Sequence, residues 1–214
     1  MSWIAAERVQ APGLAIRIWR GWLASEWGAS LEQALRAEVP WKQEEISLYG
    51  RRHPLPRLTC WMADPGCGYR YSGLQNAMEP WHPAVDELRQ RLLDLTGWPF
   101  NSVLLNHYRD GRDAMGWHAD DEPELNPEAP IASLSLGACR SFRLRPRPSP
   151  RAQAAWPEHY RPAQLNPLCL ELGPGDLLLM EAPTQLWWQH ALPRRLRVQQ
   201  PRLNLTFRVV CRQS

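Results

Sequence analysis

The 214-residue chain lacks the features that mark membrane, secreted and zinc-ribbon proteins. No apolar run approaches membrane-spanning length, and no basic segment followed by an apolar core opens the chain. Its five cysteines are an odd number and include no Cys-x-x-Cys pair, which argues against a disulfide framework or a zinc ribbon. These absences predict a cytoplasmic protein in a reducing compartment, with no membrane partner and no obligate protein partner.

Lysine is nearly absent as well. Lys42 is the only lysine in a total of 25 Lys and Arg residues, and the net charge is only +3. Arginine grips phosphate through a planar fork, which favours a nucleic-acid partner, but GC-rich coding would give the same bias. Both explanations stay open. The 12 tryptophans are enough to stack on bases as well as to fill a core.

The pattern of apolar residues predicts a mainly β fold of the α+β class, in one domain. Alternation at Leu14, Ile16 and Ile18 indicates a first strand within residues 1–20. Helices are expected at 25–39, with Ser25 as the cap, and at 83–96, between Pro83 and Gly97. A short extended stretch at 45–50 is followed by a turn at 51–57. Further strands are expected at 58–63, 102–108, 117–120, 131–136, 141–145, 168–172, 176–181, 189–192 and 202–210. Short strands with Gly and Pro turns are typical of an antiparallel sandwich or jelly roll.

One stretch carries the candidate chemistry, His118-Ala-Asp120. On an extended strand these two side chains share a face, so an imidazole and a carboxylate are delivered side by side. They are two of the three ligands of a 2-His-1-carboxylate triad that holds Fe(II) and leaves positions open. His190, on a distant predicted strand, can supply the third.

The last predicted strand has a polar face and an apolar face. Leu203, Leu205, Phe207 and Val209 form the apolar side, whereas Arg202, Asn204, Thr206 and Arg208 form the polar side. Two arginines suit a dicarboxylate, because guanidinium binds carboxylate through paired, charge-assisted hydrogen bonds. On a straight strand, however, the Cα atoms of Arg202 and Arg208 lie about 20 Å apart, so the strand must curl or the side chains must converge.

The order Asn-x-Tyr, His-x-Asp, His, Arg-x-Asn-x-Thr-x-Arg resembles the AlkB family of Fe(II)/2-oxoglutarate dioxygenases, which remove alkyl groups from damaged nucleobases. The resemblance runs from about residue 48 to 210 and is closer to the animal duplex-DNA homologues than to the founding bacterial enzyme. It implies a double-stranded β-helix with buttressing helices. It also implies Fe(II), 2-oxoglutarate and O2 as cofactor and co-substrates, with the metal on His118, Asp120 and His190. Asn106 and Tyr108 would bind 2-oxoglutarate together with Arg202 and Arg208, and Asn204 and Thr206 are weaker candidates.

The same resemblance implies how alkylated DNA is bound. Tyr69 and Tyr71 would sandwich a flipped base, and Asp121 and Glu122 would contact its edge. Carboxylates favour 1-methyladenine and 3-methylcytosine because these bases carry positive charge. Tyr49 would fill the gap in the duplex, although an ordinary half-buried strand tyrosine is an equal alternative. Solvation of a loop is the alternative for Asp121 and Glu122.

The resemblance also divides the chain into an N-terminal extension (1–47), a nucleotide-recognition segment (48–80) and a jelly-roll core (101–210). Residues 146–167, rich in Pro, Arg and Ala, are expected to form a surface insertion. The basic run Arg140, Arg143, Arg145 and Arg147 can contact phosphates, but a solvated face is the commoner reason for such a run. An RNA or tRNA demethylase, a protein hydroxylase and a catalytically silent nucleic-acid-binding module remain as alternatives.

Overall fold

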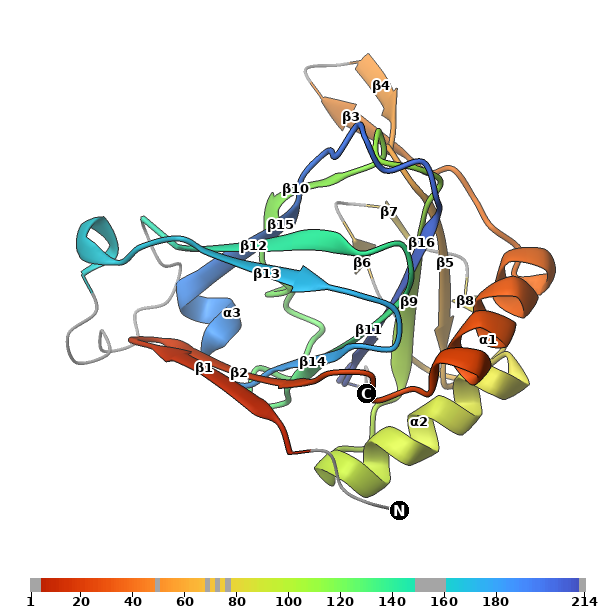
Figure 1. The fold of residues 1–214 in the computed structure, drawn as a ribbon, viewed down its shortest axis with the longest axis horizontal. Coiled ribbons are helices and arrows are strands. Elements are labelled where there is room, and N and C mark those ends of the chain that lie inside the picture. The colour runs from red at the N-terminus through yellow and green to blue at the C-terminus, as the bar shows by residue number, and fades with distance from the viewer. Residues whose placement is uncertain are drawn as a thin grey trace.

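Two β-sheets frame the molecule in the computed structural model, which describes residues 5–48, 51–67, 70–71, 74–75, 78–148 and 161–211 (Figure 1). The backbone alone is described at 47, 48, 51, 70, 71, 74 and 75. The larger sheet has 8 strands, in the order β1 (Glu7–Ala11), β2 (Leu14–Trp19), β14 (Leu177–Met180), β11 (Ile131–Gly137), β16 (Arg202–Arg208), β9 (Ser102–Tyr108), β5 (Leu58–Ala63) and β8 (Met78–Glu79). The smaller sheet has 4 strands, in the order β10 (Met115–His118), β15 (Trp188–Leu192), β12 (Arg140–Pro146) and β13 (Leu168–Leu172). This is the jelly roll that the sequence predicts.

Two short hairpins stand apart from these sheets. β3 (Glu45–Leu48) pairs with β4 (Arg51–Pro54), and β6 (Arg70–Tyr71) pairs with β7 (Leu74–Gln75). The turn predicted at 51–57 is therefore wrong for its first residues, which form a strand. A 3-10 turn, η1 (Pro162–Gln164), lies at the end of the predicted surface insertion.

Two helices, α1 (Ser25–Glu38) and α2 (Pro83–Thr96), cover one face of the larger sheet (Figure 1). Their buried leucines pack against the apolar side of β16, which confirms the two-faced pattern of that strand. Helix α2 has the predicted bounds, because the residues that start and end it, Pro83 and Gly97, can be recognised in the local sequence. Gly97 closes it in the left-handed conformation at φ 75°, which costs a glycine little. Ser25 is not the cap of α1; Ala24 is, and no side chain caps the helix.

A second apolar cluster fills the space between the two sheets. Ile16 and Ile18 from β2 meet Leu144 from β12 there, and Trp187 and Trp188 close one side. The predicted first strand is in fact a hairpin, β1 and β2, in which Gly13 turns the chain at φ 73°. A short helix, α3 (Thr184–Trp187), was not predicted from the sequence. No helix in the described part of the chain is both long and apolar enough to cross a membrane.

Candidate active site

The two candidate histidines face each other across a strand pair. His118 on β10 is the register partner of His190 on β15, and their ring centroids lie 4.1 Å apart. Phe142 on β12 stacks on His190, with ring centroids 5.1 Å apart and an interplanar angle of 26°. Since Phe142 shares a sheet with both histidines, the smaller sheet fixes the relative position of the two imidazoles.

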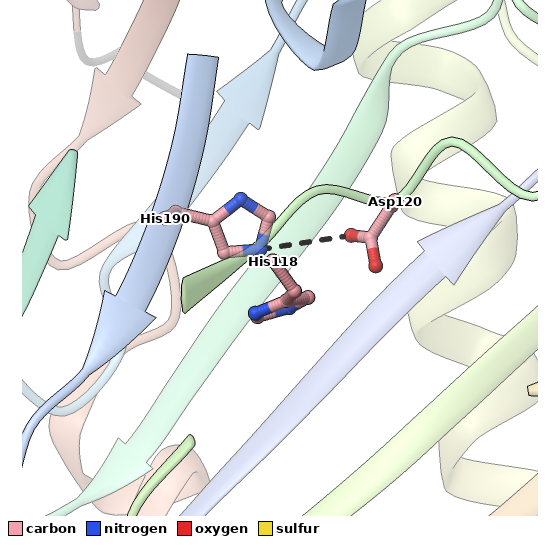
Figure 2. Close-up of side chains that lie close together, drawn as sticks. All are labelled: His118, Asp120 and His190. Carbon is pink, nitrogen blue, oxygen red and sulfur yellow. Dashed lines mark ion pairs between the residues drawn. The ribbon is translucent and has the colours of Figure 1, made fainter. Parts of the chain in front are cut away.

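Asp120 joins the histidines from outside the sheet. β10 ends at His118, two residues before Asp120, so the strand predicted at 117–120 is displaced and delivery on one strand face is wrong. Asp120 is 4% exposed, and its carboxylate accepts a hydrogen bond from Nη2 of Arg208 at 2.8 Å. Its other oxygen lies 3.9 Å from Nε2 of His190 (Figure 2). One ligand atom from each of His118, Asp120 and His190 lies within 4.8 Å of the others.

The protonation states of His118, Asp120 and His190 favour the binding of a metal cation. Burial lowers the pKa of His190 to about 3 and also lowers the pKa of His118. Burial alone would raise the pKa of Asp120, but the positive charges around it, Arg208 foremost, hold that pKa well below its usual range. At neutral pH the cluster therefore offers two neutral imidazoles and a carboxylate, the forms that bind metal. Nδ1 of His118 lies 2.9 Å from the Gly116 carbonyl oxygen, so the tautomer that donates there leaves Nε2 as a ligand. This donor set fits Fe(II).

A cavity of about 30 Å³ opens beside the cluster. Its walls come from β9, β10, β11, β12, β14, β15 and β16, so both sheets contribute. All six residues predicted to bind 2-oxoglutarate line it: Asn106, Tyr108, Arg202, Asn204, Thr206 and Arg208.

Arg202 is a buried cation without a carboxylate partner among the described residues. Only 2% of it is exposed, its Nη2 donates to the hydroxyl of Ser135 at 2.8 Å, and its Nε has no hydrogen-bond acceptor in that part of the chain. Burial lowers its pKa to about 10, so it stays charged at neutral pH. The guanidinium also lies over the ring of Tyr108, at 5.6 Å. A buried arginine that lines this cavity and has no carboxylate partner among the described residues fits a carboxylate of the co-substrate.

Arg208 has a different environment. It is 3% exposed and its Nη2 is bound to Asp120, so it lies at the metal end of the cavity. Asn204 and Thr206, between the two arginines, are engaged in a hydrogen-bonded row. The amide nitrogen of Asn204 donates to Ser133, and Thr206 donates to the amide oxygen of Asn204.

Sequence reasoning missed several residues of the cavity. Ser133 lines the cavity and Ser135 accepts the hydrogen bond of Arg202. Both could have been found, because they alternate with leucines on a predicted strand and so place hydroxyls on one face. Phe142, Met115 and Met180 also line the cavity, but apolar residues in predicted strands carry no signal of their own.

The predicted base-binding residues are only partly described. Tyr49 and Tyr69 lie outside the described residues, and Tyr71 is described by its backbone alone, in β6. Asp121 forms an ion pair with Arg147 at 2.9 Å, both side chains being largely buried. Asp121 and Glu122 line a second cavity of about 80 Å³ that shares Asp120 and Met180 with the first.

The basic run does not act as one surface. Arg140 is 1% exposed and donates to the carbonyl oxygens of Asp110, Asp113 and Pro193, so it holds loops together inside the protein. Of the four arginines only Arg143 is well exposed, and Arg145 lies over the Trp117 ring at 4.4 Å.

Comparison with known proteins agrees with this site. The model of the 2OG-Fe(II) oxygenase superfamily matches residues 15–208. The DNA oxidative demethylase ALKBH2 of Mus musculus is 42% identical over 167 residues, which are 78% of this chain and 66% of the relative. The alpha-ketoglutarate-dependent dioxygenase alkB homolog 3 of Homo sapiens is 40% identical over 183 residues, 84% of this chain and 60% of that protein. These two identities are too close to rank one relative above the other.

The structure of OsALKBH1 shares the fold, with a TM-score of 0.57 at 18% identity, covering 94% of this chain and 99% of that one. Against the ALKBH2 proteins of mouse, cattle and human, the chain spans 66%, 57% and 60% of their length, which is less than two thirds. The family match nevertheless covers most of the chain. Members of this superfamily use Fe(II), 2-oxoglutarate and O2, so these are the cofactor and co-substrates of this chain. The chain therefore belongs to the 2OG-Fe(II) oxygenase superfamily, and within it to the AlkB family that its sequence resembles.

Proposed function

We propose that this protein oxidatively demethylates N-alkylated nucleobases in DNA, with 1-methyladenine and 3-methylcytosine as substrates. The observation that carries the proposal is one cavity lined both by the His-Asp-His cluster and by Arg202, which has no carboxylate partner among the described residues. A nucleic-acid-binding module needs neither feature. The names of the relatives, DNA oxidative demethylase among them, support DNA as the substrate.

In this proposal His118, Asp120 and His190 hold the metal. Fe(II), together with 2-oxoglutarate and O2, would supply the oxidation of an N-methyl group: the methyl carbon leaves as formaldehyde, and 2-oxoglutarate is converted to succinate and CO2. The chain's own residues orient the reactants. Arg202 would bind one carboxylate of 2-oxoglutarate, with Tyr108 and Asn106 beside it on β9. Arg208 keeps the Asp120 carboxylate charged.

Selection of the base would come from the acidic segment that follows the metal ligands. Methylation at N1 of adenine or N3 of cytosine leaves a positive charge, and a carboxylate at the base edge stabilises that charge relative to a normal base. Asp121 and Glu122 are the proposed contacts. Because Asp121 is held by Arg147, its position at the pocket wall is fixed before the base arrives.

The segment 48–80 is proposed to hold the nucleotide, with Tyr69 and Tyr71 stacking on the flipped base and Tyr49 on the duplex gap. It begins at the last residue of β3, in the β3–β4 hairpin, which projects from the sheets at one end of the molecule (Figure 1).

A panel of oligonucleotides tests the proposal. One sequence with a single 1-methyladenine is prepared as single- and double-stranded DNA and RNA, and each is incubated with protein, Fe(II) and 2-oxoglutarate. Formaldehyde and succinate should appear in equal amounts with DNA, and Asp120→Ala should abolish both. Asp94→Ala removes an exposed carboxylate on α2 and serves as the matched control.

Turnover confined to RNA would contradict the DNA assignment. The absence of succinate with every oligonucleotide would contradict the activity. A drop with Tyr49→Ala that is larger on duplex than on single-stranded DNA is expected if Tyr49 fills the gap; at ~1–3 kcal/mol of stacking it amounts to roughly 5- to 150-fold. Equal losses on both substrates would make Tyr49 a folding residue.

A further inference from the structure

Asp120 is held by a residue far away in the sequence. Because β10 ends at His118, Asp120 lies beyond the strand that fixes the histidine. Its backbone N–H instead donates to the side-chain oxygen of Gln185, at 3.1 Å, across 65 residues of sequence. The side chain of Gln185 thus fixes the backbone at the point where the strand no longer does.

The orientation of the Gln185 amide is determined by its two neighbours. An N–H group needs an acceptor, so the oxygen of Gln185 must face Asp120. The amide nitrogen then faces the sulfur of Met180, at 3.3 Å, and thioether sulfur is an acceptor only. The reverse orientation would place donors against the Asp120 N–H and oxygen against sulfur, so one arrangement is strongly preferred.

Helix α3, which carries Gln185, is itself anchored to the N-terminal hairpin. The Thr184 hydroxyl accepts from the backbone N–H of Ala15 at 3.0 Å and donates to the Ala15 carbonyl oxygen at 3.1 Å. Just after the helix, the indole N–H of Trp188 donates to the carbonyl oxygen of Pro12 at 3.1 Å. Gly13 packs so closely on Trp187 that an added Cβ would lie 2.7 Å from the Trp187 Cβ. α3 therefore has little freedom to move relative to β1 and β2.

We propose that Gln185 is a positioning residue for the metal centre: it fixes the backbone of Asp120 so that the carboxylate faces His118 and His190. The proposal rests on the proposed function, in that it takes Asp120 as a metal ligand. The carboxylate has a competing partner, since Arg208 binds it at 2.8 Å. Without the hydrogen bond to Gln185, the backbone at Asp120 can shift and the carboxylate can turn toward Arg208. A metal ion bound by His118 and His190 would then be bound more weakly by Asp120.

Metal binding by the metal-free protein tests this. Co(II), which binds the same nitrogen and oxygen ligands as Fe(II), is titrated into wild type, Gln185→Leu and Gln185→Glu, and binding is followed by calorimetry. Gln185→Leu keeps the size but removes the acceptor, and should weaken Co(II) binding by about 10- to 100-fold, as loss of groups that orient metal ligands does. Gln185→Glu keeps an acceptor for the Asp120 N–H, although it has no donor for the Met180 sulfur, and should bind Co(II) more tightly than Gln185→Leu. Gln33→Leu, an exposed glutamine on α1, is the matched control.

Hydrogen exchange gives a readout that needs no metal. The Asp120 amide should exchange faster in Gln185→Leu than in wild type, because its acceptor is gone. Wild-type Co(II) affinity in Gln185→Leu, or an equal loss in Gln185→Glu, would overturn the inference. So would an equal loss in Gln33→Leu. If Gln185→Leu does not fold, Gln185→Met, which keeps the unbranched stem, takes its place.

These results separate the inference from the proposed function. If wild type and His190→Ala bind Co(II) alike, the metal centre itself is wrong. If wild type binds more tightly than His190→Ala while Gln185→Leu matches wild type, only the role of Gln185 is wrong.

Discussion

Replacing Arg202 by methionine should abolish tight 2-oxoglutarate binding while leaving the ligand-free protein as stable as wild type or slightly more so. Arg202 is 2% exposed and, in the described part of the chain, has no carboxylate partner. Burial lowers its pKa from 12.5 to about 10, which at 1.36 kcal/mol per pKa unit means that the folded environment disfavours the charged guanidinium by about 3 kcal/mol. The substitution also removes the hydrogen bond to Ser135 and the stacking on Tyr108, which together stabilise the wild-type fold by about 2 kcal/mol. The ligand-free Tm should therefore rise by about 2–4 °C, the value of a net gain of about 1 kcal/mol.

The effect on 2-oxoglutarate is larger and of opposite sign. Removing one partner of a buried, hydrogen-bonded charge pair costs about 2–5 kcal/mol, which is roughly a 30- to 4000-fold rise in Kd. At 100 times its Kd a ligand stabilises its protein by about 2.7 kcal/mol, or about 5–11 °C in a chain of this size. The same concentration should stabilise Arg202→Met by less than about 1 kcal/mol. Arg202→Lys keeps the positive charge but cannot form two parallel hydrogen bonds to a carboxylate. Its stabilisation by 2-oxoglutarate should therefore lie between those of wild type and Arg202→Met.

The assay is thermal unfolding with and without 2-oxoglutarate, with a metal that does not turn over. Arg8→Met removes an exposed strand arginine from β1 and should leave the ligand-induced shift unchanged. A wild-type shift in Arg202→Met would refute the assignment of Arg202 as the carboxylate site. A ligand-free Tm that falls by 10 °C or more would refute the argument that this guanidinium is buried at a cost.

Other predictions follow from single contacts. Asp120→Ala should lose Co(II) binding in calorimetry and about 3–5 kcal/mol of stability in urea unfolding, because its buried arginine partner loses this carboxylate. Burial raises the pKa of Cys60 to about 12. Above pH ~9 the unfolded chain then releases a proton that the folded chain keeps, so stability should fall by up to ~1.4 kcal/mol per pH unit, and Cys60→Ala should remove that slope. Gly111→Ala should destabilise by about 1–3 kcal/mol or more, since its Cβ meets the carbonyl oxygen of Arg195, whereas Gly116→Ala, with open space, should not.

Helix α2 and strand β16 could be predicted from the sequence because the signals that define them are local. Pro83 is the first residue of helix α2 and Gly97 directly follows its last residue, so both ends are marked by residues of the local sequence. In β16 polar and apolar residues alternate along the whole strand. The apolar face is buried in the core under the helices and the polar face lines the cavity, so the burial of the strand agrees with its sequence pattern. The alternation of the strand alone is therefore enough to assign the four polar side chains to one face.

Strand β10 and the position of Asp120 could not be predicted in the same way. The pairing of β10 with β15 is irregular between Met115 and His118, and that irregularity depends on a partner more than 70 residues away. The contacts that place Asp120 come from Gln185 and Arg208, at separations of 65 and 88 residues. A pattern of alternation assumes that the strand continues, and nothing between His118 and Asp120 signals that it stops.

The separation of Arg202 and Arg208 sets the length of the active site. Six residues of strand place their Cα atoms about 20 Å apart if β16 is straight, which is too far for two arginines to grip one end of a small dicarboxylate. Arg208 does not need to reach that end, because its guanidinium is bound to Asp120. Arg202 lies beside Tyr108 and Ser135, where the described residues offer it no carboxylate. Since the apolar side of the same strand packs under α1 and α2, the core that fixes β16 also fixes the distance between the metal ligands and the anion site.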